Sequence, residues 1–241
     1  MTSPKPTLGT FVKTASPHVV EVLGTTTLDF VCVDAEHAPF DRATLDLMVM
    51  AGRAAGIRVF IRIAEVNPAI VLSALDIGAA GLLVPHIDSA DQARAVVAMA
   101  RYRDGARGFS SSPRFAGYGS LGMKEALRIG DEAQVICQIE SPEAVEAVDD
   151  ILAVPGVAGI FVGRADLALA MGLDSPRDEK VLAATTRVLA AAKQAGKIAG
   201  MHVAGNAERE QFAALGADWF VVSSDQTLLR AAAAAIAHPA A

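Results

Sequence analysis

Eight short apolar runs recur along the chain, each followed by a helical or alanine-rich stretch. The expected strands are Leu8–Val12, Phe30–Asp34, Val59–Ile63, Gly81–Pro85, Val135–Glu140, Gly159–Gly163, Ile198–Val203 and Trp219–Ser223. The expected helices include Arg42–Ala55, Pro68–Asp76, Ala90–Arg101, Pro142–Ala153, Val181–Ala195 and Glu208–Leu215. This alternation indicates parallel strands, and runs such as FVCV and GLLVP are continuously apolar because helices cover their outer face. Eight such units predict an α/β fold, a (β/α)8 barrel of the TIM type.

The length of 241 residues suits one barrel domain over residues 1–241. Hydrophobic residues make up 52% of the chain but aromatic residues only 5%, which favours a close-packed aliphatic core between layers. An open doubly wound sheet is the main alternative. That fold usually carries GxGxxG in its first turn, whereas the first expected strand here leads into KTASPH.

The charge balance excludes a protein that binds nucleic acid through a basic surface, because the chain has 21 Lys and Arg against 27 Asp and Glu and contains no basic run. Cys32 and Cys137 lie in apolar runs without a CxxC spacing, which predicts reduced core thiols. The first residues lack the charged head and apolar stretch of a signal peptide, and no segment has the character of a membrane span. We therefore expect a cytoplasmic protein with no membrane or nucleic-acid partner.

The longest irregular connection, residues 102–121, is rich in glycine and serine. Long loops of this kind in compact domains are usually functional. We expect this loop to lie over the mouth of the barrel.

Polar residues interrupt the apolar runs where the strands end, which is where (β/α)8 barrels carry their chemistry. They are Asp34, Glu36, His37, Arg62, His86, Gln138, Glu140, Arg164 and Asp166. Buried charges are costly unless they are compensated. The pattern therefore predicts a bound ion or substrate at this end of the barrel.

Glu140 and Asp166 follow neighbouring strands, so their oxygens are candidates to share one hard divalent cation, with water and substrate completing its octahedron. The alternative is structural: Glu140 would cap the helix beginning at Ser141-Pro142, and Asp166 would charge the first turn of its own helix. Residue type alone leaves both open.

His37, in DAEHAPFD, is the candidate acid or base, with Asp34 close enough in sequence to orient it; a plain loop histidine is the alternative. Arg62 lies in an apolar strand and is predicted to clamp an anion or enolate. Gly163 precedes a helix start, so the backbone N–H groups of Ala165 and Asp166 are candidates to bind a carboxylate, unless the turn is purely structural. No lysine is expected at a strand end, Lys13 included, which disfavours Schiff-base chemistry.

Over nearly its whole length the chain resembles the HpcH/HpaI family of class II pyruvate aldolases. The segments that carry the resemblance are DAEHAPFD, FIRI, LDIGAAGLLVP, QIESPEAV and FVGRADLALAMG. Five motifs in the family's order are far more specific than any one alone. The resemblance implies a phosphoenolpyruvate/pyruvate-type barrel and a carbon–carbon lyase. The enzyme would cleave 4-hydroxy-2-oxo acids to pyruvate, or a close 2-keto acid, and an aldehyde through a metal-stabilised enolate.

Carried over residue by residue, the resemblance implies that Glu140 and Asp166 bind Mg²⁺, Mn²⁺ or Co²⁺ and that Gln138 hydrogen-bonds around the metal. It implies that His37 acts with metal-bound water as acid or base, that Arg62 stabilises the enolate, and that Asp76 supports the site, from its own or a neighbouring subunit. It also implies a homohexamer, a trimer of dimers, with a last helix exchanged between subunits. The alanine-rich segment after Asp225 would supply that helix.

Two departures from the family bear on specificity. The chain has Gly163-Arg164-Ala165-Asp166 where the family commonly has proline second, and FSSSPRFAGYG differs from the usual loop. Two other functions stay open: an acyl-CoA ester lyase of malyl or citramalyl type, and a non-catalytic barrel that binds a keto acid. The lyase would need a basic surface, for which Arg101, Arg103, Arg107 and Arg114 are candidates.

Overall fold

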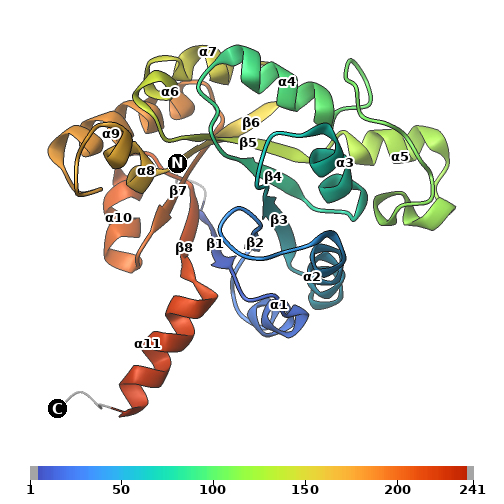
Figure 1. The fold of residues 1–241 in the computed structure, drawn as a ribbon, viewed down its shortest axis with the longest axis horizontal. Helices are drawn as coiled ribbons and strands as arrows, with labels where there is room; N and C mark the ends of the chain where they lie inside the picture. Colours follow the sequence, from blue (N-terminus) through green and yellow to red (C-terminus); the bar gives the residue numbers. More distant parts are fainter. Residues whose placement is uncertain (1–4, 238–241) are drawn as a thin grey trace.

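The computed structural model describes residues 5–237 and forms a closed barrel of eight parallel strands in chain order (Figure 1). The strands are β1 (Thr7–Val12), β2 (Phe30–Asp34), β3 (Arg58–Arg62), β4 (Gly81–Val84), β5 (Gln134–Ile139), β6 (Val157–Val162), β7 (Ile198–Val203) and β8 (Trp219–Ser224). Closure comes from β1, which pairs in parallel with both β2 and β8. The predicted (β/α)8 barrel is therefore confirmed, and the open sheet is ruled out.

Helices follow the strands around the outside of the barrel (Figure 1). They are α1 (Pro17–Gly24), α2 (Arg42–Ala55), α3 (Pro68–Asp76), α4 (Ala90–Ala100), α5 (Met123–Gly130), α6 (Pro142–Glu146), α7 (Val148–Ala153), α8 (Arg164–Ala170), α9 (Glu179–Gln194), α10 (Asn206–Ala214) and α11 (Asp225–Ala237). One predicted helix, Pro142–Ala153, is interrupted at Ala147, where α6 ends and α7 begins. α9 begins before the predicted Val181 because the Asp178 side chain caps it by accepting from the Lys180 N–H.

The core has two layers because successive strand residues point to opposite faces. The outer layer joins strands to helices through aliphatic residues such as Val31, Ile61 and Val84. The inner layer fills the barrel with larger side chains: Phe11, Phe30, Cys32, Phe60, Leu83, Ile136, Phe161, Trp219 and Val221. Trp219 stacks on Phe30 with 4.0 Å between ring centroids. The interior of the barrel is therefore a packed core rather than a pore.

Both cysteines are buried and free, as predicted, Cys32 in the inner layer and Cys137 in the outer layer. Burial raises the pKa of each thiol to about 12. Neither thiol is therefore ionised or nucleophilic near neutral pH.

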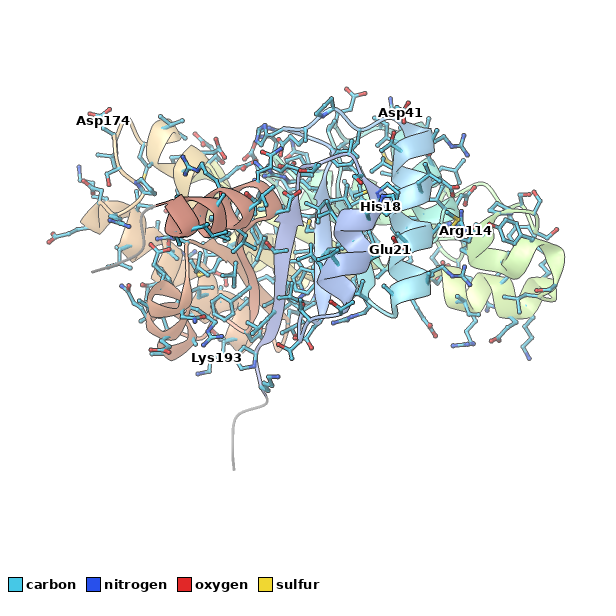
Figure 2. All side chains as sticks on the ribbon, turned by 90° about the horizontal axis from the view of Figure 1, so that it is seen from below. His18, Glu21, Asp41, Arg114, Asp174 and Lys193 are labelled. Carbon is cyan, nitrogen blue, oxygen red and sulfur yellow. The ribbon has the colours of Figure 1, made fainter. Side chains whose placement is uncertain are left out.

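The loop over residues 102–121 does not cover the mouth, so that expectation is wrong. α4 runs from the mouth to the opposite end of the barrel, and the loop starts there and returns through α5 to the start of β5. Its single 3-10 turn, Arg114–Gly119, packs on the flank, where Arg114 contacts Asp46 of α2 at 2.6 Å. In Figure 2, Asp41 and Asp174 mark the mouth side, whereas Arg114 lies lower on that flank.

α11 leaves the end of β8 and projects away from the other elements (Figure 1). Its side chains are exposed from Gln226 to Ile236, with Leu229 73% and Ile236 84% exposed. Within the part of the chain that the structure describes, no helix has the length and apolar character needed to cross a membrane.

Candidate active site

A ring of mostly polar residues closes the inner layer at the mouth of the barrel. On each strand the residue two positions beyond an inner-core residue points to the same side. The ring consists of Lys13, Asp34, Arg62, Gln138, Gly163, His202 and Ser223. Except for Asp34, all of these line a cavity of about 560 Å³, as do His37, Ala165 and Asp166. The cavity is the candidate active site.

Asp34 and Arg62 form a buried bidentate ion pair across β2 and β3. Arg62 Nε donates to Asp34 Oδ1 at 2.9 Å and its Nη2 donates to Oδ2 at 2.7 Å. Lys13 Nζ lies 3.2 Å from the same Oδ2. Burial alone would raise the pKa of Asp34, but the hydrogen bonds and charge of Arg62 hold it below its usual value. Asp34 is therefore a fixed anion that orients the guanidinium.

Asp34 contributes stability that depends on pH. Its folded-state pKa is lowered, so this contribution is present above its ordinary pKa of about 3.9 and is lost as the pH falls through the folded-state value. We expect the free energy of unfolding to fall less steeply between pH 5 and pH 3 in Asp34→Asn than in the wild type, as measured by urea denaturation. The exposed Asp174→Asn variant should keep the wild-type slope. Equal slopes for Asp34→Asn and wild type would contradict this account.

His37 lies on the rim with 54% of its side chain exposed. Asp34 does not orient its ring, contrary to expectation, because the Asp34 carboxylate accepts from the His37 backbone N–H at 3.2 Å. The carboxylate beside the ring is Glu36, with Oε2 3.7 Å from His37 Nε2. Burial raises the pKa of Glu36, and its Oε2 makes no hydrogen bond.

Glu140 is 4% exposed and is held from two sides. Its Oε1 accepts from the His86 backbone N–H at 2.8 Å and lies 2.9 Å from His86 Nδ1, while Gln138 Nε2 donates to Oε2. Ser141, not Glu140, caps α6 by accepting from the Ala144 N–H at 3.0 Å. Glu140 therefore does not cap this helix, which excludes the structural alternative for this residue.

A chain of contacts joins Arg62 to Glu140 through Glu36 and His86. Arg62 Nε lies 3.3 Å from Glu36 Oε2, Glu36 Oε1 lies 3.5 Å from His86 Nε2, and His86 Nδ1 reaches Glu140. His86 holds this position with a left-handed φ of 57°. Such backbone strain persists where the surroundings enforce it, as at functional sites.

Glu140, Asp166 and Gln138 carry the oxygen atoms that are candidates to hold a hard divalent cation. Asp166 lies in the first turn of α8, and the Gln138 Oε1 atom is buried without a hydrogen-bond donor. Within residues 5–237, no group of three or more His, Cys, Asp or Glu is gathered as metal ligands. Two carboxylates with open positions are what Mg²⁺ commonly takes from a protein, the remainder coming from water and substrate oxygens.

Gly163 allows the turn before α8 to approach Glu140. A Cβ on Gly163 would lie 2.9 Å from Glu140 Oε2 and 3.1 Å from Gln138 Nε2. We expect Gly163→Ala to lower kcat/KM about a hundredfold by displacing these groups. Gly205→Ala is the control, because its added Cβ meets nothing within 4 Å. Full activity of Gly163→Ala would show that this close approach is not needed.

Arg164, the departure from the family turn, is directed toward α10. Its Nη2 lies 3.1 Å from Glu208 Oε2, and its guanidinium lies 4.6 Å from the Phe212 ring centroid. Glu208 also accepts from the Ala204 N–H at 2.8 Å. The added cation is therefore balanced by Glu208, although Arg164 still borders the cavity.

Asp76 is not brought to the mouth within one chain. It ends α3 at the opposite end of the barrel, where its Oδ1 accepts from Arg107 Nη2 at 2.9 Å.

The arginines considered for coenzyme A also lie away from the mouth: Arg107 is buried, Arg114 pairs with Asp46, and Arg101 donates to the Gly156 carbonyl. The structure therefore provides no support for a basic coenzyme A site at this mouth.

Lys13 and Ser223 are cavity residues that the sequence analysis did not identify. Lys13 directly follows β1 and lines the cavity, so the expectation that no lysine lies at a strand end is wrong. Strand alternation was the available signal, because Lys13 lies two residues beyond Phe11 of the inner layer.

The comparisons with known proteins show the family to which the chain belongs. The family model for the HpcH/HpaI aldolase/citrate lyase family matches residues 7–232. A 5-keto-4-deoxy-D-glucarate aldolase of Klebsiella pneumoniae is 35% identical over 227 residues, which are 93% of this chain and 88% of that protein. A family structure from Burkholderia cenocepacia is 34% identical with a TM-score of 0.91, covering 97% of this chain and 94% of the other. The citrate synthase SbnG is 27% identical with a TM-score of 0.86, covering 97% and 92%. The chain belongs to the HpcH/HpaI aldolase/citrate lyase family of carbon–carbon lyases.

Proposed function

We propose that the protein is a divalent-metal-dependent aldolase that cleaves 4-hydroxy-2-oxo acids into pyruvate, or a close 2-keto acid, and an aldehyde. The observation that carries the proposal is the contact chain from the buried Arg62–Asp34 pair to Glu140. It joins a guanidinium that lines the cavity to a buried carboxylate that would bind the metal. The name of the Klebsiella relative, an aldolase for a keto-deoxy sugar acid, supports this substrate class.

Glu140 and Asp166 would hold the cation, and a bound Mg²⁺, Mn²⁺ or Co²⁺ supplies Lewis acidity for the 2-keto oxygen. The Arg62 guanidinium stabilises negative charge on that oxygen as the C3–C4 bond breaks and its electron pair moves onto the keto-acid half. Gln138 and the turn at Gly163, Ala165 and Asp166 position the keto acid.

His37 accepts the proton of the 4-hydroxyl as the aldehyde carbonyl forms, and Glu36, 3.7 Å from its ring, stabilises the imidazolium. The proton then returns to C3 to give pyruvate. Because the His37 ring lies on the rim, it reaches the substrate from the cavity side.

The test is pyruvate release from a panel of 4-hydroxy-2-oxo acids, with and without EDTA, followed by restoration with Mg²⁺, Mn²⁺ or Co²⁺. We expect EDTA to abolish activity and at least one cation to restore it. EDTA-resistant activity would contradict the proposal.

Since Lys13 lies in the mouth, borohydride treatment with pyruvate is a needed second measurement. No mass adduct is expected, whereas an adduct on Lys13 would indicate Schiff-base chemistry.

We also propose that the chain forms a homo-oligomer, a hexamer arranged as a trimer of dimers, with α11 exchanged between subunits and Asp76 supporting a neighbouring subunit's site. The exposed apolar side chains of α11 support this proposal, because monomers rarely project such a helix into water. We expect Leu229→Glu combined with Ile236→Glu to lower the mass measured by light scattering. An unchanged mass would contradict a role for α11.

Buried, unpaired Cys32 and Cys137 support a reducing, cytoplasmic location.

A further inference from the structure

The turn that carries Asp166 has little support of its own. α8 spans only seven residues, Arg164–Ala170, and within residues 5–237 no side chain caps its N-terminus at Gly163. Short helices with uncapped ends fray readily, because their first N–H groups have no partner inside the helix. The proposed function nevertheless needs this turn to hold Asp166 at the cation and the Ala165 and Asp166 N–H groups at the keto acid. The turn therefore depends on contacts outside α8.

Arg164, the first residue of α8, reaches from this turn to the neighbouring helix α10 (Figure 1). Its Nη2 lies 3.1 Å from Glu208 Oε2 and donates to the His202 carbonyl of β7 at 3.4 Å. Its guanidinium also lies 4.6 Å from the Phe212 ring centroid. Only 11% of the Arg164 side chain is exposed, so these contacts are largely shielded from water. They tie the start of α8 to β7 and α10.

Glu208, at the other end of this tie, is itself held in place. Its Oε2 accepts from the Ala204 N–H at 2.8 Å, in the connection between β7 and α10. It lies in the first turn of α10, where the helix dipole favours a carboxylate. Phe212, 2% exposed, anchors the same helix to the core. Arg164 therefore joins the short α8 to a firmly packed part of the molecule.

Arg164 also separates the active-site cavity from a side pocket of about 280 Å³ that is bordered by α8, α9 and α10. Arg164 and Pro176 line both spaces. The groups that the guanidinium contacts on α10, Glu208 and Phe212, line the side pocket and not the cavity. The charged end of Arg164 is therefore directed away from the substrate, and its effect on the site passes through the turn at Asp166.

We infer that the Arg164–Glu208 pair is a brace that positions Asp166 and the adjoining N–H groups for the cation and the keto acid. The inference rests on the proposed aldolase function and makes Arg164 a positioning residue. Residues that orient a metal ligand typically change metal affinity about 10–100-fold when they are replaced. Loss of either partner should therefore weaken the cation and the keto acid together.

The test is a double-mutant cycle of Arg164→Met, Glu208→Met and their combination. Calorimetric titration measures Mn²⁺ affinity without substrate. Exchange of the pyruvate methyl protons in D₂O, followed by NMR at saturating Mg²⁺, gives kcat and KM for the keto acid without an aldehyde. We expect each single variant to weaken Mn²⁺ binding and raise the KM for pyruvate about tenfold, with a smaller change in kcat. The combined variant should be no weaker than either single one, because the second substitution breaks nothing further.

A rescue variant and a control sharpen the test. Arg164→Pro lacks the ion pair but fixes the first helical φ near about −65°. Gly163 before it has a φ of −88° and a ψ of 77°, outside the α region that a following proline disfavours. We expect Arg164→Pro to recover most of the Mn²⁺ affinity that Arg164→Met loses. Arg177→Met removes a 77% exposed cation that lies 4.0 Å from Glu208 Oε1 without touching α8, and it should match the wild type.

The outcomes separate the brace from other roles. If Arg164→Met loses affinity while Glu208→Met binds Mn²⁺ and pyruvate as the wild type does, Arg164 acts on the ligands directly and the brace is wrong. The brace is also wrong if Arg164→Pro is as weak as Arg164→Met. If the wild type exchanges protons and every variant matches it, only the brace fails. If the wild type neither exchanges protons with any of the three cations nor binds Mn²⁺, the proposed function fails with it.

Discussion

Arg62→Met is expected to lower kcat/KM for aldol cleavage by on the order of a thousandfold or more. Removing one preorganised group that stabilises a developing oxyanion costs about 10²–10³ in rate, and here the group carries a full charge in a buried setting. The substitution also leaves the fully buried Asp34 carboxylate with Lys13 as its remaining charged partner. Breaking a buried pair from one side typically costs about 3–5 kcal/mol, so the free energy of unfolding should fall as well.

Two further variants separate the catalytic loss from the structural one. Arg58→Met removes an arginine from the opposite, exposed end of the same strand, and both activity and stability should stay close to wild type. Adding Asp34→Leu to Arg62→Met removes the stranded carboxylate, so denaturation should show recovered stability while activity stays low. If the double variant regained activity along with stability, Arg62 would have only a structural role.

The barrel was predictable because each strand is covered on both faces. Runs such as FVCV of β2 and GLLV of β4 contain no polar residue, so they are not mistaken for loops. Such runs also recur at a regular spacing along the chain. The helices were less regular. α1 is short, and α5 follows a loop whose polar composition hides its start, so neither was assigned in advance. Short amphipathic segments give few turns of periodicity on which to decide.

The candidate site was predictable where a charged residue interrupted an apolar run. Asp34 and Arg62 stood out for this reason, and the structure pairs them directly. Lys13 did not stand out because it follows its strand and looks like the start of a loop. The contact of Asp76 with Arg107 joins two helix ends distant in sequence, and no local pattern indicates such a pairing. The 102–121 loop lies away from the mouth because α4 runs from the mouth to the opposite end of the barrel. The sequence analysis did not take this direction into account.

The second large effect is expected at Glu140. Glu140→Gln keeps the size of the side chain and an oxygen able to accept from the His86 N–H, so the fold should persist. It removes the charge that would hold the cation, whose stabilisation of transition-state charge is worth several kcal/mol. We expect kcat/KM to fall by on the order of a thousandfold. Calorimetric titration with Mn²⁺ should show weakened binding in the same variant.

Glu143→Gln is the matched control, because Glu143 is an exposed carboxylate three residues further along, in α6. It should keep wild-type activity and Mn²⁺ affinity. The comparison distinguishes two roles for Glu140. If Glu140→Gln binds Mn²⁺ normally but is inactive, Glu140 acts through His86 and Glu36 on the proton transfers rather than on the metal. If it is active within tenfold of wild type, neither role holds, and Asp166 would have to bind the cation with other oxygens of the cavity.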